Sequence, residues 1–171
     1  MRKVSRLHVY AILILALFAH LTVLNHARLF NASPDLMLIL VVLWGLFLGR
    51  GLGLEAGVAA GLLLDIFSLD IFWTNTLILG SAGVGAGFLN TKFFKESKAT
   101  QVFIVFSLAL LSMLGRFACG ALLGAVSRIN FYDYLISSAL PVSAYTAVVS
   151  IPVSSKFIDI YHLREPDEDL I

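Results

Sequence analysis

Apolar residues follow one another along most of the chain and are interrupted only by short polar breaks. A helix needs roughly 20 mainly apolar residues to cross the hydrocarbon core of a bilayer. We therefore predict an all-α integral membrane protein whose single domain, residues 1–171, holds six transmembrane helices and a short tail at 158–171. The six predicted spans lie at about residues 8–25, 34–49, 51–70, 74–91, 101–125 and 135–157.

The second span is short for a transmembrane helix. About 16 residues would reach only about 24 Å. Such a span requires either a locally thinner bilayer or burial among its neighbours. The GRGLG segment at 49–53 leaves so little chain between spans two and three that we predict an antiparallel hairpin there.

The cations predict the orientation, because cytoplasmic loops carry an excess of Lys and Arg. With the N-terminus in the cytoplasm, six crossings place both termini inside. Only Arg28 and Arg128 then lie outside, and Arg116 lies within the membrane. The cytoplasmic cations are Arg2, Lys3, Arg6, Arg50, Lys92, Lys95, Lys98, Lys156 and Arg164. A signal peptide over 1–27 is the competing interpretation, but its apolar run is longer than usual and lacks a clear cleavage site.

Composition agrees with a membrane protein. The chain is 59% hydrophobic and 13% charged, about half the charge of an average soluble domain. A net charge of +1 gives no sign of a nucleic-acid partner. The single Cys119 excludes an intrachain disulfide and a cysteine-based metal site.

Span three carries small residues at intervals of four. Gly53, Gly57 and Gly61 form this series, and Asp65 continues it. Steps of four stay on one side of a helix, and small residues there let another helix approach closely. We expect this face to serve helix packing or partner binding. Asp65 should then point into the bundle, because a carboxylate facing lipid is costly.

Span five carries a similar series, Ser112, Arg116, Gly120 and Gly124, for which we expect the same role. In the predicted topology Asp65 and Arg116 lie at matched depth, roughly 21–23 Å above the cytoplasmic helix ends. We therefore predict an intramembrane ion pair between them. Arg116 could instead extend to the interface, or meet Asp70 or an acidic group of a partner protein.

The sequence offers no recognisable catalytic centre. It lacks HExxH, a phosphate-binding GxxxxGK[ST] segment and a nucleophile elbow. Asp65 and Asp70 are about 140° apart around one helix, so they do not suit an aspartyl dyad. The four histidines are scattered across different depths. We expect no enzyme activity, no metal and no cofactor.

Two segments resemble the MreD family of rod-shape-determining membrane proteins: SPDLMLILVVLWGLFLGRGLGLEAGVAAGLLLDIFS at 33–68 and TNTLILGSAGVGAGFL at 74–89. The family has a Pro-Asp/Asn-Leu opening to its second span and a glycine-rich third span ending in G-x-x-x-D-x-x-S. A Gly-x-Asn-like element follows, and here Trp73 stands in place of its glycine. The matching residues are Pro34, Asp35, Leu36, Gly57, Gly61, Asp65, Ser68 and Asn75. The residue types also predict the start of the second span. Ser33 is expected as the N-cap and Pro34 as the first helical residue, and the helix dipole favours the negative charge of Asp35 near the N-terminus.

This resemblance implies a non-enzymatic scaffold of the bacterial cell-elongation complex in the cytoplasmic membrane. Its implied partners are an MreC-like bitopic protein, the MreB filament, the glycosyltransferase RodA and the transpeptidase that works with RodA. Through RodA and the transpeptidase, the chain would support cell shape and lateral peptidoglycan synthesis.

The family is also similar to the substrate-binding subunits of energy-coupling-factor transporters, which are six-helix membrane proteins. The alternative function is therefore binding of a vitamin-type molecule, in a pocket lined by Asp65, Arg116 and nearby aromatic residues. Such a pocket should have longer outer loops and polar groups from several spans. The outer loops here are short, which favours the scaffold.

Overall fold

The computed structural model describes residues 6–22, 33–67, 73–90, 97–124 and 130–161. All regular elements within these ranges are helical, as predicted. They are α1 (Arg6–Thr22), α2 (Leu36–Leu48), α3 (Arg50–Phe67), α4 (Thr74–Phe88), α6 (Lys98–Leu122), and a continuous rod made of α7 (Phe131–Tyr134), the π-helix η1 (Leu135–Ala139) and α8 (Leu140–Tyr161).

Within the described residues, each predicted apolar run coincides with a helix or with the final rod, and the predicted ends at 23–25, 68–70, 91 and 125 lie outside those residues. Two segments, Lys98–Leu122 and Phe131–Asp159, have the length and apolar composition to cross a membrane unaided. Val9–His20 and Leu36–Leu48 are shorter apolar helices. The number of spans remains a prediction at this point.

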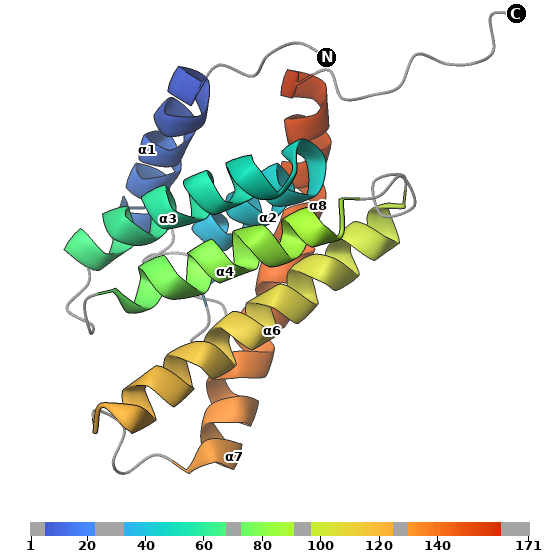
Figure 1. Cartoon of the computed structure of the whole chain (residues 1–171). Helices are drawn as coiled ribbons and strands as arrows, with labels where there is room; N and C mark the ends of the chain where they lie inside the picture. Colours follow the sequence, from blue (N-terminus) through green and yellow to red (C-terminus); the bar gives the residue numbers. More distant parts are fainter. Residues whose placement is uncertain (1–5, 23–32, 68–72, 91–96, 125–129, 162–171) are drawn as a thin grey trace, which may run out of the picture.

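The α2 helix forms the centre of the bundle. Every residue from Met37 to Phe47 is buried, and α1, α3, α4, α6 and α8 all pack against it (Figure 1). A helix that is apolar on every side is surrounded either by protein or by lipid. Here other helices surround it, so the short second predicted span is buried among its neighbours.

A single residue, Gly49, joins α2 to α3. Its backbone has φ +93°, a conformation that residues with a Cβ rarely adopt. The chain therefore reverses within one residue. A Cβ on Gly53 of α3 would lie 2.7 Å from the Cα of Gly45 in α2, so the two helices are in close contact next to the turn. This is the predicted antiparallel hairpin.

The glycine face of α3 lies directly against α4. A Cβ added at Gly53, Gly57 or Gly61 would come within 3.0 Å of backbone atoms of α4. Gly83 of α4 approaches Gly53 in the same way. Close packing of this kind joins helices where burial from water provides no driving force.

The order of the helices separates α3 from α6, because α4 lies between them (Figure 1). On its other side α6 packs against α8. The π-helical turn Leu135–Ala139 comes just before Pro141. Proline has no N–H to donate, so the helix departs from α geometry in the preceding turn.

Candidate functional site

The carboxylate of Asp65 caps the first turn of α4. Its Oδ1 accepts hydrogen bonds from the backbone N of Asn75 (3.1 Å) and from Asn75 Nδ2 (3.0 Å). Its Oδ2 accepts from the backbone N of Thr76 (3.0 Å) and from Thr76 Oγ1 (2.6 Å). Asp65 is 3% exposed. A buried carboxylate with both oxygens bonded at a helix N-terminus is electrostatically satisfied.

The cap comes from another helix because α4 lacks one of its own. Trp73 occupies the N-cap position, has φ +78° and makes no capping hydrogen bond with its side chain. The first N–H groups of a helix have no partner within the helix, and lipid cannot supply one. Asp65 fills this requirement from the end of α3. The motif residues Asp65 and Asn75 are therefore direct neighbours, while Ser68 lies outside the described residues.

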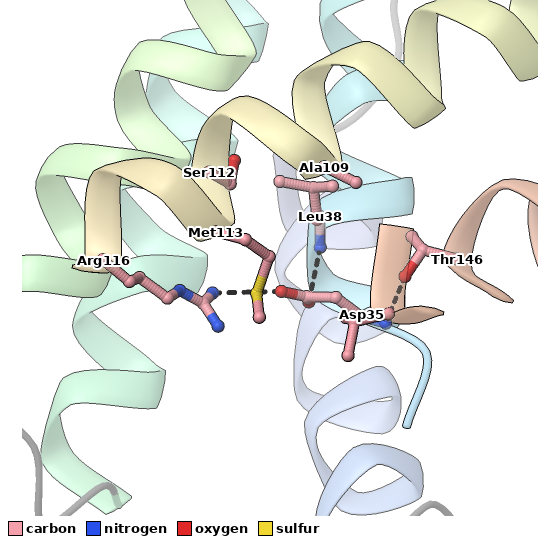
Figure 2. A pocket seen from close by; sticks show the side chains of 8 residues that line it. Asp35, Leu38, Ala109, Ser112, Met113, Arg116 and Thr146 are labelled. Atoms are coloured by element: carbon pink, nitrogen blue, oxygen red, sulfur yellow. Dashed lines mark hydrogen bonds and ion pairs between the residues drawn. The ribbon is translucent and has the colours of Figure 1, made fainter. Parts of the chain in front are cut away.

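The guanidinium of Arg116 pairs with Asp35, as Figure 2 shows. Arg116 Nη2 lies 3.0 Å from Asp35 Oδ2. Asp35 Oδ1 accepts a hydrogen bond from the backbone N of Leu38, and the backbone N of Asp35 donates one to Thr146 Oγ1. The donor–acceptor distance is 3.0 Å in both bonds. Asp35 therefore joins the start of α2 to α6 and α8.

Two predictions about these residues are corrected. Arg116 meets Asp35 and not Asp65, because α4 stands between α3 and α6 and its first turn takes both oxygens of Asp65. The N-cap of α2 is Asp35 and not Ser33, because the carboxylate of Asp35 accepts the N–H of Leu38. Pro34 accordingly precedes the helix.

A double-mutant cycle measures the pair that the structure contains. We expect Asp35→Asn and Arg116→Gln to show a coupling energy of about 1 kcal/mol in equilibrium unfolding, since the side chains share one contact. Asparagine keeps the N-cap function, which isolates the ionic contact. Asp65→Asn with Arg116→Gln is the control and should be additive. The reverse result, coupling to Asp65 alone, would restore the original prediction.

The other predicted packing residues of α6 divide into two groups. Ser112 and Gly120 are buried. Gly124 differs from the prediction: it follows the end of α6 at φ +74°, and a Cβ there would meet nothing within 4 Å. Gly124 N donates to Ala121 O, a bond that ends the helix. Glycine at this place terminates α6, as glycines commonly do.

A small pocket lies beside the Asp35–Arg116 pair. Its cavity volume is about 10 Å³, about enough for one water molecule, and its polar lining comes from Asp35, Ser112, Arg116 and Thr146 (Figure 2). Sites for small organic molecules usually enclose about 300–1,000 Å³. Asp65, which was expected to line a pocket with Arg116, is not part of this one.

The strained backbone of Trp73 makes a testable prediction. Trp73 holds the place of the glycine in the Gly-x-Asn element, and a left-handed conformation costs a residue with a Cβ about 1–2 kcal/mol. We expect Trp73→Gly to be more stable than Trp73→Ala by about 1 kcal/mol in unfolding experiments, since both lose the ring and only alanine keeps the Cβ. Equal stability of the two variants would show that the backbone there is unstrained.

The described residues contain no group of three or more His, Cys, Asp or Glu side chains that could hold a metal ion. The acidic groups of the site act instead as caps and as an ion-pair partner. Their arrangement joins α2, α3, α4, α6 and α8 at one end of the bundle.

Comparison with known proteins identifies a family. A family model described as rod shape-determining protein MreD matches residues 1–161. No curated protein and no solved structure matches the chain.

Proposed function

Since the chain belongs to the MreD family of rod-shape-determining membrane proteins, we propose that it is a non-enzymatic scaffold of the bacterial cell-elongation complex. It binds an MreC-like bitopic protein. Directly or through that protein, it acts with RodA, its transpeptidase and the MreB filament to support lateral peptidoglycan synthesis.

The observation that carries this proposal is the use of the polar side chains. Asp35, Asp65 and Arg116 all hold helices together through capping or pairing contacts. Polar groups inside a membrane protein often mark a substrate path. Here these three side chains are bonded to other helices, which favours a rigid scaffold over a substrate path.

The outward surface of the long helix α6 also supports a scaffold. It presents large apolar side chains along its whole length, including Phe103, Leu111 and Leu122. Such a surface suits contact with lipid and with the transmembrane helix of a partner.

We further propose that the protein crosses the cytoplasmic membrane six times with both termini inside. The packing supports alternating helix directions. Arg50, at the start of α3, lies over the ring of Phe88 at the end of α4. Trp44 and Phe47, near the end of α2, pack against Phe157 of α8. Cations Arg50 and Lys156 thereby gather at the end of the bundle opposite Asp35, as the positive-inside rule requires.

Co-purification tests the scaffold. When the tagged protein is extracted from membranes in mild detergent, we expect an MreC-like bitopic protein and a polysaccharide-polymerising enzyme to accompany it. An unrelated tagged polytopic protein from the same cells is the control. If the protein is recovered alone, the scaffold proposal fails.

A vitamin-type binding subunit is the second candidate, and the pocket beside Arg116 is the observation that favours it. The Nε atom of Arg116 is buried without a hydrogen-bond partner among the described residues, so it could receive an acceptor from a ligand. The small volume of the pocket argues against this function. Mass spectrometry of the purified protein distinguishes the two, because a carrier retains a stoichiometric small molecule.

A further inference from the structure

Two neighbouring helices differ strongly in length. The α4 helix has 15 residues and α6 has 25. At 1.5 Å per residue these lengths correspond to about 22 Å and about 38 Å. The hydrocarbon core of a typical bilayer is about 30 Å thick, so α4 is too short for it and α6 is long enough.

A common tilt does not remove this difference, because the two helices run side by side in step. A Cβ on Gly85 would lie 3.6 Å from Leu108, and one on Gly115 would lie 3.5 Å from Ile78. Gly85 and Ile78 of α4 are as far apart in the sequence as Leu108 and Gly115 of α6, so both helices cover the same length between the two contacts. Any tilt that fits α6 into the bilayer therefore shortens the projected length of α4 as well.

The outward face of α4 has an apolar band with marked ends. Leu77 is 68% exposed and lies between two exposed aromatic residues, Trp73 and Phe88. Arg50 lies over the Phe88 ring, with its Cζ 4.5 Å from the ring centre. Tryptophan and arginine favour the membrane–water interface. These residues hold the two ends of the band about 22 Å apart.

We propose that the bilayer is locally thinned where it meets α4, and that this face selects phospholipids with short acyl chains. The inference rests on the proposed multi-pass insertion. Neighbouring helices fix the tilt of α4, and a span too short for its bilayer is otherwise accommodated by deforming the lipid. The outward face of α6 does not require the bilayer to thin, because its apolar residues from Phe103 to Leu122 cover about 28 Å.

Two matched fluorescent probes test the proposal. Leu77→Cys on α4 and Leu111→Cys on α6 replace leucines that are similarly exposed, 68% and 65%. Each is made in full-length protein with Cys119→Ala and labelled with bimane. The labelled proteins are reconstituted into phosphatidylcholine mixtures in which either the short myristoleoyl or the long erucoyl chains are brominated, and quenching by each lipid is compared.

We expect the Leu77 probe to favour the short-chain lipid at least about twofold, and the Leu111 probe to show a clearly smaller preference for it. Equal selection at the two positions, or a long-chain preference at Leu77, would overturn the inference and leave the topology intact. If neither lipid quenches the Leu77 probe while the Leu111 probe is quenched, α4 does not face lipid and the inference is wrong. If neither probe is quenched by either lipid, the proposed membrane insertion is wrong as well.

Discussion

Replacing Asp65 with alanine is expected to destabilise the protein by about 3 kcal/mol or more, the largest effect that we predict for a single side chain. The change removes a helix cap, which alone is worth about 1 kcal/mol. It also leaves the donors of Asn75 and Thr76 buried without an acceptor, and each unsatisfied donor costs about 1–3 kcal/mol. Reversible unfolding in mixed detergent micelles measures the difference.

Two further variants make this test specific. Asp65→Asn keeps one acceptor oxygen and should lose less stability than Asp65→Ala. Asp159 is exposed on α8, so Asp159→Ala removes a carboxylate without disturbing a cap and should be nearly neutral. An Asp65→Ala protein as stable as the original chain would show that the capping bonds contribute nothing.

The second large effect is expected at the interface between α3 and α4. A Cβ on Gly57 would lie 2.8 Å from the carbonyl carbon of Leu79 and 2.9 Å from the Cα of Gly80. These are backbone atoms, which cannot move aside as a flexible side chain can. Overpacking of this kind costs about 1–3 kcal/mol, so Gly57→Ala should lower the free energy of unfolding even though alanine favours the helix.

Gly51 supplies the matched control in the same helix. A Cβ there would meet nothing within 4 Å, so Gly51→Ala should be neutral or stabilising by up to about 1 kcal/mol through helix propensity. The same substitution should therefore destabilise the protein at position 57 and be neutral or stabilising at position 51. Similar effects at both would mean that α3 and α4 do not pack as closely as the structure indicates.

Much of the helical framework could be predicted from the sequence because it depends on local patterns. Apolar runs locate the helices, and the four-residue spacing of Gly53, Gly57 and Gly61 identifies the face of α3 that lies against another helix. The spacing of these glycines along α3 can be read without knowing where the other helices lie. The partner of that face, α4, depends on how the helices are arranged in space.

The contacts of the charged residues could not be predicted in the same way. Matched depth suggested Asp65 as the partner of Arg116, but depth does not say which helices are neighbours. One local signal was available: the α4 helix begins after Trp73, a residue that cannot cap it, so a cap from elsewhere was required. The helix dipole accounts for Asp35 at the start of α2 without any partner, so no local pattern indicates its contact with Arg116.

The complete enclosure of α2 has a consequence for biosynthesis. This helix leaves the ribosome early, whereas α6 and α8, which help to cover it, are made last. Until the final helix is inserted, the nascent chain exposes a core that is built to contact protein. We therefore expect chains truncated before α6 to be held by insertion factors or removed by membrane quality-control proteases.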